Sequence, residues 1–377
     1  MNGYSMPVVV HLIDFSTRNP WVENQMVFFK KQGIEQGLLS ISTRGEIHEV
    51  VRSNGFQKVQ NIERGIFGFF RTCSLVKTWS KEETVYIYAH GHLASVYASF
   101  IRTFTGIDFI LCHHQQPEFF SLLRKKMYFR ASIHMAFARF YRLRARRIQS
   151  FSPEVTSSLM RKGIESNKIV EIPLGMNFEN YFELDTKPTQ KSNPKAISIV
   201  SVSRLVWEKR MSLGIKTVAR LLELGIPVDY KIVGEGPDLS NLTKLIDELG
   251  VSAHVSLLGW RDNVNEILNE SDVFFHLSLT ESYGQVLMEA RLSGISIFSS
   301  SCGVALEMEK LNDLKVHVFY GSDPKVIAEA FIQFLDRIES QRNMISPDPR
   351  DLYSGHEFEK VLLKVQEMFQ EIFKADS

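Results

Sequence analysis

The amino-acid sequence predicts an α/β protein built from two doubly wound domains. Short apolar runs alternate with helical patterns in both halves of the chain, which is typical of βαβ units and parallel sheets. The length of 377 residues suits two domains, and 44% hydrophobic residues with 11% aromatic residues suffice for two cores. We therefore expect two parallel sheets covered by helices, with a cleft between the domains.

Six apolar runs of strand length occur in the first half of the chain. The first, PVVVHLID at residues 7–14, lacks a preceding basic segment and reaches Asp14 too soon for a signal peptide, so it predicts a buried strand. Further strands are expected at residues 38–42, 84–89, 108–112, 147–151 and 168–173. The second half predicts strands at residues 196–203, 228–234, 254–259, 272–278, 295–300 and 315–320.

A polar stretch with two prolines and no periodicity, ELDTKPTQKSNPK, separates the two sets of strands and is typical of a linker. We accordingly expect an N-terminal domain at residues 1–185, a linker at 186–195 and a C-terminal domain at 196–350. The remaining residues, 351–377, are expected to form a helix that packs back towards the N-terminal domain.

Cysteine content and hydropathy indicate a cytoplasmic protein. Cys73, Cys112 and Cys302 have neither metal-ligand spacing nor the density of a disulfide framework, which favours a reducing compartment. No apolar run approaches the length that spans a bilayer.

Basic residues are concentrated in the first half. Residues 1–185 hold 23 Lys and Arg against 16 Asp and Glu, whereas the remainder holds 21 against 27. Nine basic residues and no acid lie in residues 124–147, where apolar side chains recur at helical spacing. Two interpretations remain open: the apolar stripe packs on the sheet, or the helix binds an anionic membrane surface through Arg142, Arg146 and Arg147.

The stretch ESYGQVLMEARLSG, residues 281–294, predicts a loop followed by a helix that begins near Tyr283 or Gly284 and stops at Gly294. The free amides at such a helix start form an anion site, and Glu281 and Glu289 lie on either side of it. Glutamates flanking an anion site are suited to binding hydroxyls. The alternative is a capping acid and a solvated helix glutamate.

Other strand ends in the second half of the chain supply groups that could complete this anion site. Arg204 and Lys209 follow the strand at 196–203, the turn GEGP begins at Gly234, and Trp260 follows the strand at 254–259. Each is ordinary alone, as a surface charge or a plain turn. Together with the helix start they indicate a site in which cations and amides hold a diphosphate while the two carboxylates hold sugars.

The ordered motifs SRLVWEK, YKIVGEGPDLSNL, VSLLGW, DVFFHLSLTESYGQVLMEARLSG and GVALE resemble the C-terminal domain of glycosyltransferase family 4. These are retaining enzymes with the two-domain GT-B fold that use nucleotide sugars. The two glutamates separated by seven residues are part of that family's signature. The resemblance covers roughly residues 85–310.

The resemblance implies roles for individual residues. Arg204 and Lys209 would neutralise the donor diphosphate, Glu281 would hold hydroxyls of the donor sugar, and Glu289 would hold the ribose. His113 would lie beside the reacting sugar, and His114 is an acceptor-side candidate. The other donor-binding residues would be Gly234, Glu235, Gly236, Trp260, Tyr283, Gly284, Gln285 and Val286.

The co-substrate implied is a UDP- or GDP-sugar, and no metal is expected because no two aspartates are spaced as Asp-x-Asp. Two departures from the family pattern occur. The loop after the first strand, DFSTRNPWVENQ, lacks the usual glycine pair, and Arg210 stands where glycine is common. Arg210 either adds a phosphate contact or is solvated.

We therefore expect a retaining, hexosyltransferase-type glycosyltransferase of surface polysaccharide or glycoconjugate biosynthesis. Its acceptor would be a saccharide or, at the inner face of the cell membrane, a lipid-linked saccharide; nucleic acid is not expected as a partner. A nucleotide-sugar epimerase on the same fold and an inactive nucleotide-sugar-binding homologue are the alternatives.

Overall fold

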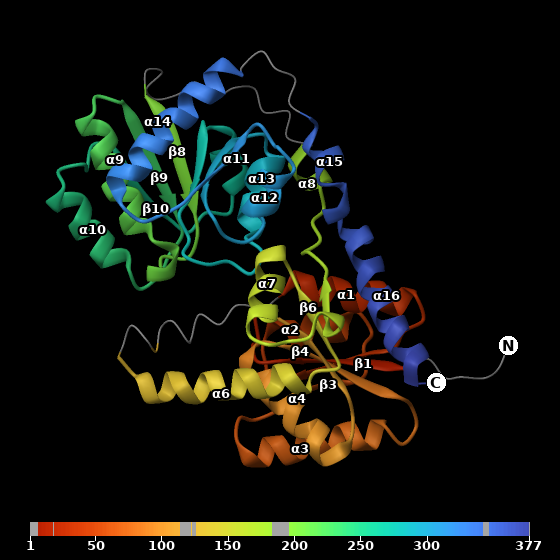
Figure 1. Ribbon diagram of the computed structural model, residues 1–377. Coiled ribbons are helices and arrows are strands. Elements are labelled where there is room, and N and C mark those ends of the chain that lie inside the picture. The colour runs from red at the N-terminus through yellow and green to blue at the C-terminus, as the bar shows by residue number, and fades with distance from the viewer. Residues whose placement is uncertain are drawn as a thin grey trace. The chain divides into compact units, whose positions relative to one another are not determined.

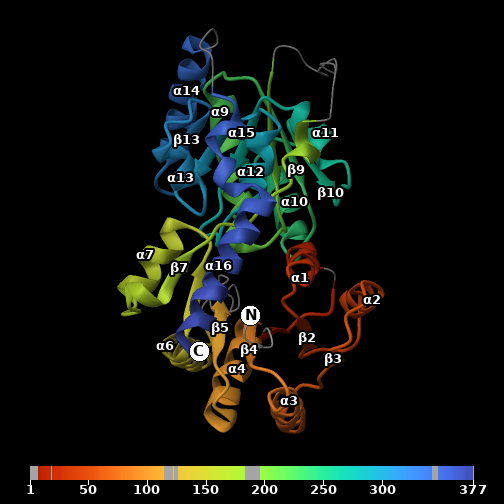
Figure 2. The same ribbon diagram turned by 90° about the vertical axis from the view of Figure 1, so that its right-hand side faces the viewer.

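The computed structural model describes residues 7–17, 19–113, 122, 126–182, 196–341 and 347–376. The chain divides into two compact units, seen in Figures 1 and 2. The first unit comprises residues 1–151, 155–175 and 359–377, and the second comprises residues 152–154 and 176–358.

The first unit is built on a parallel sheet that has seven strands in the described part of the chain. Its strands lie in the order β3 (Val59–Asn61), β2 (Gln36–Ser40), β1 (Val8–Ile13), β4 (Val85–His90), β5 (Phe109–Cys112), β6 (Arg147–Ser150) and β7 (Ile169–Glu171). All six strands expected in this half are present, and β3 is additional. β3 escapes sequence analysis because it is short and only Val59 in it is buried.

Strand β2 begins two residues before the expected position because its first residue is polar but buried. The Gln36 side-chain oxygen lies 2.9 Å from Nε2 of His11 on β1, a hydrogen bond within the core. A hydrogen-bonded glutamine of this kind does not show in an apolar pattern.

Helices cover both faces of the first sheet. Helices α3 (Ile66–Trp79), α4 (His92–Thr105) and α6 (Tyr128–Arg144) share one apolar core with the sheet, whereas α1 (Pro20–Lys31) and α2 (Glu46–Ser53) share another. Helix α7 (Pro153–Arg161) and the 3₁₀ turn Ser166–Lys168 lead into β7.

The second unit repeats this strand order. Its parallel sheet, with six strands in the described residues, has the order β10 (Val255–Gly259), β9 (Val228–Val233), β8 (Ile197–Val202), β11 (Val273–His276), β12 (Ser296–Ser300) and β13 (Val316–Phe319). All six strands match those expected from the sequence, which confirms the predicted α/β class. In each sheet the order reverses beside the first strand, between β1 and β4 and between β8 and β11. Ligands of doubly wound folds bind at the carboxyl ends of strands on either side of such a reversal.

Helices also flank the second sheet, and its core is rich in phenylalanine. Phe275 and Phe298 of the sheet pack with Phe331 of helix α14. The helical segments of this unit are α8 (Glu179–Phe182), a 3₁₀ turn (Trp207–Lys209), α9 (Met211–Glu223), α10 (Leu239–Glu248), α11 (Val264–Asn269), α12 (Gln285–Leu292), α13 (Ala305–Lys310), α14 (Pro324–Ser340), α15 (Pro349–Leu352) and a 3₁₀ turn (Ser354–His356).

The chain enters and leaves the second unit at adjacent points. Met176 and Glu357 form a parallel bridge, in which the Met176 amide donates to the His356 carbonyl and the Phe358 amide donates to the Met176 carbonyl, both at 2.9 Å. The second unit thus begins at Met176 rather than after residue 185. The linker expected at 186–195 lies outside the described residues.

The last helix, α16 (Phe358–Asp376), contributes side chains to the first unit. Phe369 is fully buried and makes edge contacts with Phe29 of α1 and Tyr88 of β4, with ring centroids 5.5 and 5.4 Å apart. Phe373 lies 5.0 Å from the ring of Tyr86. The sheet of the first unit is therefore partly covered by the end of the chain.

We expect Phe369→Ala to destabilise the first unit by about 3–5 kcal/mol, because it leaves a cavity between α16 and the sheet. Leu363→Ala on the same helix is the matched control; Leu363 is 48% exposed, and its substitution should change stability by no more than about 0.5 kcal/mol. Urea unfolding followed by circular dichroism measures both. Equal losses in the two variants would show that α16 is not part of this core.

Candidate functional site

The carboxyl ends of β8 and β9 are held together by their backbones. The Ser203 amide donates to the Val233 carbonyl at 3.0 Å, and the Leu205 amide donates to the Glu235 carbonyl at 2.7 Å. Gly234 has a φ of +131°, and a Cβ there would lie 1.9 Å from the Ser203 carbonyl oxygen. This glycine is therefore needed for the close approach of two loops.

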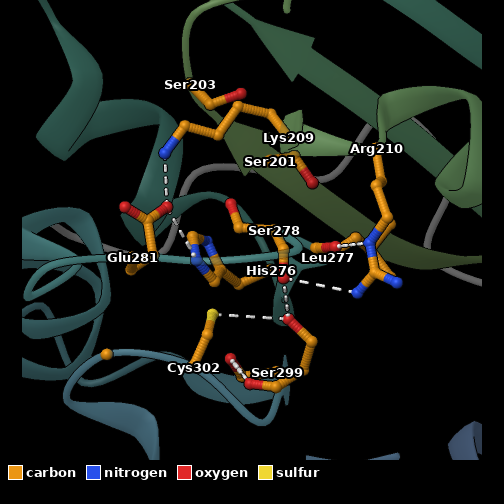
Figure 3. A network of polar contacts seen from close by, with 12 residues as sticks. Ser201, Ser203, Lys209, Arg210, His276, Leu277, Ser278, Glu281, Ser299 and Cys302 are labelled. Atoms are coloured by element: carbon orange, nitrogen blue, oxygen red, sulfur yellow. Dashed lines mark hydrogen bonds and ion pairs between the residues drawn. The ribbon is translucent and has the colours of Figure 1, made fainter. Parts of the chain in front are cut away.

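The loop after β8 brings Lys209 to the loop after β11. Figure 3 shows the Lys209 ammonium paired with Oε1 of Glu281, a residue 72 positions later. Both side chains are largely buried, with 17% and 13% exposed. The pair bridges the two strand ends at which the order of the second sheet reverses. Arg204 lies exposed in the same loop after β8.

A third group completes this cluster. His276, the last residue of β11, is buried, and its Nε2 lies 3.3 Å from Oε1 of Glu281 without the alignment of a hydrogen bond. Burial alone would raise the pKa of the Glu281 carboxyl, but His276 and Lys209 outweigh burial and lower it from 4.5 to about 2. Glu281 is therefore ionised at neutral pH and acts only as a hydrogen-bond acceptor.

Arg210 has a role that neither sequence interpretation anticipated. Its Nε donates to the Leu277 carbonyl at 2.5 Å and its Nη2 to the Ser278 carbonyl at 3.3 Å, so it is not free in solvent (Figure 3). The residue has a left-handed backbone, with a φ of +52°, at the start of α9. That conformation suits glycine best. In this chain the arginine instead ties the Lys209 turn to the end of β11.

Helix α12 begins at Gln285, where the sequence expects it. Gly284 is the residue before the helix and has a φ of +84°, which favours glycine. The amides of Gln285 and Val286 occupy the first helical positions, which lack partners within the helix. The helix start therefore presents donors next to Glu281.

The residue before Gly284 fixes this helix start. Tyr283 is buried, its hydroxyl lies 2.7 Å from Nδ1 of His356, and its carbonyl accepts from the Val304 amide at 2.6 Å. Nε2 of His356 lies 3.0 Å from Oε1 of Glu307. Tyr283 thus acts on the site through its backbone, while its side chain is engaged in the interior.

Glu289 lies one turn inside α12. Burial raises the pKa of its carboxyl, an effect that hydrogen bonds from Gln285 and Tyr181 partly offset. Nε2 of the Gln285 side chain donates to Oε1 of Glu289 at 3.0 Å. Tyr181 belongs to α8. The two glutamates of the motif therefore have opposite pKa shifts and separate surroundings.

The remaining expected donor-side residues are more dispersed. Glu235 is exposed, and only its carbonyl takes part in the loop contact; Gly236 follows it in the same turn. Trp260 is 68% exposed beyond β10, and its indole Nε1 donates to Asp262 at 3.1 Å. The contacts described for Glu235 and Trp260 do not involve Lys209 or Glu281.

In the first unit, His113 is buried directly after β5, and its amide donates to the Gln149 carbonyl at 3.0 Å. His114 lies outside the described residues. Asp14, which directly follows β1, accepts a hydrogen bond from the Leu93 amide at 3.0 Å. A Cβ on Gly91 would lie 2.5 Å from this carboxylate. The Asp14 carboxylate therefore accepts from an amide in the first turn of α4 and lies against its N-cap, Gly91.

Within the basic segment, Tyr128–Arg144 form α6, and two expectations about this helix need correction. Of the apolar stripe, Phe129, Ile133 and Phe137 are exposed, and Phe140 is half-buried with its ring centroid 5.5 Å from that of Phe100 on α4. The stripe therefore does not pack on the sheet. Arg142 is buried, with 7% exposed, and is therefore unsuited to contact a membrane. Arg146 is half-buried and lies 4.0 Å from Asp108.

Sequence reasoning missed His276 and His356 as parts of the site and did not anticipate the contacts that Arg210 makes. A histidine at a strand end next to the glutamate motif was the available signal for His276. Within the described residues, no group of three His, Cys, Asp or Glu side chains is arranged to hold a metal ion. None of the described helices combines the length and apolar character of a bilayer-crossing segment.

Glu281→Gln should reduce stability at neutral pH by on the order of 3 kcal/mol, since the folded state favours the carboxylate. Because folding lowers this pKa from 4.5 to about 2, the contribution is complete above the unfolded pKa and disappears as pH falls towards 2. Urea unfolding at neutral pH and at about pH 3 should therefore show a smaller difference in acid. Glu248→Gln, an exposed control on α10, should show little difference at either pH. A difference that does not shrink would contradict the assigned ion pair.

Comparison with known proteins adds to this geometry. Residues 183–348 match the family described as "Glycosyl transferases group 1". N-acetyl-alpha-D-glucosaminyl L-malate synthase of Bacillus anthracis is 27% identical over 201 residues, 52% of this chain and 52% of that protein. The phosphatidylinositol N-acetylglucosaminyltransferase gpi3 subunit of Schizosaccharomyces pombe is 28% identical over 149 residues, 39% of this chain and 32% of that protein. The chain thus spans only about a third to a half of the length of these relatives.

Among solved structures, Anabaena Alr3699/HepE, determined in complex with UDP, superposes with a TM-score of 0.75 at 15% identity. The match covers 96% of this chain and 99% of that one, so the likeness in fold extends over both units. The chain has the two-domain GT-B fold, and with the group 1 sequence in its second unit it is a protein like those of glycosyltransferase family 4.

Proposed function

We propose that the protein is a retaining glycosyltransferase that moves a sugar from a nucleotide-diphosphate sugar to a saccharide or lipid-linked acceptor. The observation that carries this proposal is the cluster of Lys209, Glu281 and His276 at the reversal of the second sheet, next to the start of α12. It combines a cation, an ionised acceptor and the first amides of a helix at neighbouring strand ends. The expected role is in surface polysaccharide or glycoconjugate biosynthesis.

The cations and the helix start would act on the leaving group. When the bond between the sugar's anomeric carbon and the phosphate oxygen breaks, negative charge builds on the nucleoside diphosphate. Lys209, Arg204 and the amides of Gln285 and Val286 would stabilise that charge in the transition state. Because these groups supply the positive charge, we propose that no metal is required.

Glu281 would bind the donor sugar. Its carboxylate stays ionised in the cluster, so it can accept hydrogen bonds from two sugar hydroxyls while it remains paired with Lys209. In that arrangement one residue pair contacts both the sugar and the diphosphate. His113 keeps its proposed role of contacting the reacting sugar. The acceptor hydroxyl would form the new bond to the anomeric carbon and pass its proton to the departing phosphate oxygen.

Glu289 would bind the ribose. Its present partners, Gln285 and Tyr181, are neutral hydrogen-bond donors. Ribose hydroxyls are also neutral donors, so they can replace these contacts without leaving a buried charge unpaired. The complex of the Anabaena protein with UDP supports a uridine nucleotide as the first donor to test.

The acceptor is proposed to be lipid-linked, with the protein acting peripherally at the inner face of the membrane. The name of the yeast relative, a phosphatidylinositol N-acetylglucosaminyltransferase subunit, supports an acceptor carried by a lipid. The basic helix α6, which exposes Phe129, Ile133 and Phe137, supports contact with an anionic surface. An epimerase and an inactive homologue are not favoured, because the relatives are named as transferases or synthases and both glutamates and Lys209 are present.

The test is to incubate the purified protein with a panel of UDP- and GDP-sugars in EDTA and to detect release of nucleoside diphosphate. Proton NMR of the transferred or released sugar then reports its anomeric configuration. Release with retained configuration supports the proposal. An inverted anomeric configuration of the sugar would contradict the retaining mechanism. An epimerised donor without release of nucleoside diphosphate would favour the epimerase.

Lys209→Ala and Arg204→Ala should each weaken nucleoside-diphosphate binding by about 1.5–3 kcal/mol, because each removes a charge-assisted contact. Calorimetric titration in EDTA measures the dissociation constants. Lys216→Ala, which removes an exposed lysine from α9, is the control and should bind as the wild type does. Unchanged affinity in both test variants would place the diphosphate elsewhere.

Glu281→Gln and Glu289→Gln should separate sugar binding from ribose binding. Glu281→Gln should lower turnover by orders of magnitude while nucleoside-diphosphate affinity stays intact or rises, because Lys209 loses its carboxylate partner. Glu289→Gln should weaken binding of nucleotide and donor by a similar factor, the pattern of uniform binding loss. If Glu281→Gln weakens nucleoside-diphosphate binding as much as Glu289→Gln does, the two roles are wrongly assigned. The proposed enzyme class would not be affected by that result.

A further inference from the structure

The two protein partners of Glu281 meet the same oxygen of its carboxylate. Lys209 pairs with Oε1, and Nε2 of His276 lies 3.3 Å from that same atom. Figure 3 shows these two side chains reaching the carboxylate from different directions. In the part of the chain that the structure describes, no group donates a hydrogen bond to Oε2. Oε1 is therefore held by the protein, and Oε2 has its lone pairs free for the hydroxyls of a ligand.

His276 acts on the carboxylate and does not reach a ligand itself. Only 3% of its side chain is exposed, and its ring stacks on Phe274 of the same strand, with ring centroids 6.0 Å apart. Its Nε2 is buried without an aligned hydrogen bond, although leaving a buried nitrogen unsatisfied is costly. A small reorientation of the Glu281 carboxylate towards the ring would complete that hydrogen bond.

The proposed donor gives Lys209 a second anion to bind. An ammonium carries one positive charge, which the diphosphate of the donor would share with Glu281. Negative charge brought close to Glu281 favours protonation of its carboxyl. A protonated carboxyl has fewer lone pairs to offer the sugar hydroxyls. Glu281 therefore needs another hydrogen-bond donor, one that the diphosphate does not reach.

We propose that His276 is a positioning residue, which becomes the main hydrogen-bond partner of Glu281 when the donor diphosphate engages Lys209. Its Nε2–H would donate to Oε1, keep the carboxylate ionised and leave Oε2 directed at the donor sugar. The buried Nε2 would thus complete its hydrogen bond only in the complex with the donor. This inference rests on the proposed function, because it adds a residue to the same donor site.

The surroundings of Glu281 offer no substitute for His276. Burial acts against ionisation of the Glu281 carboxyl, and His276 and Lys209 overcome it to lower the pKa to about 2. The Cys302 thiol, on the loop after β12, is neutral because burial raises its pKa to about 12. Glu154, which belongs to the second unit, adds negative charge near Cys302 and accepts from the Gly303 amide at 2.8 Å.

The test is calorimetric titration of the full chain with UDP and with GDP in EDTA. His276→Phe keeps a ring that can stack on Phe274 but removes the N–H, and it should weaken nucleoside-diphosphate binding by about tenfold or more. His317→Phe is the matched control. His317 lies on β13 and stacks on Phe298, with ring centroids 5.3 Å apart, so its replacement should leave the affinity as in the wild type.

The same substitution is then made in the Glu281→Gln protein, in which no carboxylate needs a partner. There His276→Phe should change the affinity by less than about twofold, because the two residues act as a pair. An equal loss of affinity in both backgrounds would show that His276 acts through packing and would overturn the proposal. Wild-type affinity in His276→Phe alone would overturn it as well.

His276→Gln and His276→Asn decide the question if the phenylalanine variant does not fold. The amide of glutamine can reach the position of Nε2, whereas the shorter side chain of asparagine brings its amide only to the position of Nδ1. His276→Gln should therefore bind nucleoside diphosphate several-fold more tightly than His276→Asn. Equal affinities in these two variants would contradict the role assigned to Nε2.

Turnover of a nucleotide-sugar donor gives a second readout. Loss of His276 raises the pKa of Glu281, so the acid limb of the kcat/KM profile should move to higher pH in His276→Phe and stay in place in His317→Phe. A wild-type protein that binds neither UDP nor GDP would contradict the proposed function, and this role of His276 with it. Binding that depends on Lys209 but not on His276 would overturn only the role of His276.

Discussion

The ion pair between Lys209 and Glu281 connects two loops of the second unit. The sheet places these loops near each other but does not itself connect them. Parallel strands β8 and β11 are neighbours at the reversal of strand order, so the segments that follow them leave the sheet side by side. The backbone does not by itself decide how these segments meet. The ion pair supplies one link, and the bonds from Arg210 to the carbonyls that end β11 supply another. The cluster is thus a set of charges that these two links hold in place.

The start of α12 is held by a different set of contacts. Tyr283, His356 and Glu307 form a chain of side-chain contacts, and the Tyr283 carbonyl accepts from Val304. At the other end of the helix, buried Arg291 pairs with Asp313, which also accepts from the Tyr353 hydroxyl at 2.7 Å. The short segment from Tyr353 to His356 therefore reaches both ends of α12. Buried networks of this kind rigidify when every member has a partner.

Much of this architecture could be predicted because strands and helix starts have characteristic patterns in short stretches of sequence. Buried parallel strands appear as apolar runs, and the start of α12 appears as Gly284 followed by strong helix formers. Glu281 and Lys209 were recognised as site candidates from their positions after strands. Their direct pairing was not, because it depends on the paths of loops separated by 72 residues in sequence. Nor does a pattern distinguish a phenylalanine stripe that packs on a sheet from one that stays exposed, as α6 shows. The burial of Gln36 and the interior contact of the Tyr283 side chain were not predicted, because polar residues in a core do not show in an apolar pattern.

The adjacent crossing points at Met176 and Glu357 have a consequence for how the chain is made. The second unit is an insertion whose two ends meet, so nearly all of it has left the ribosome before the last helix has. The first unit needs that helix, because Val361, Val365 and Phe369 are buried side chains at the end of the chain. During synthesis the second unit can therefore complete its core first. The strands of the first unit that precede the second unit wait with part of one face of their sheet uncovered until α16 has been made.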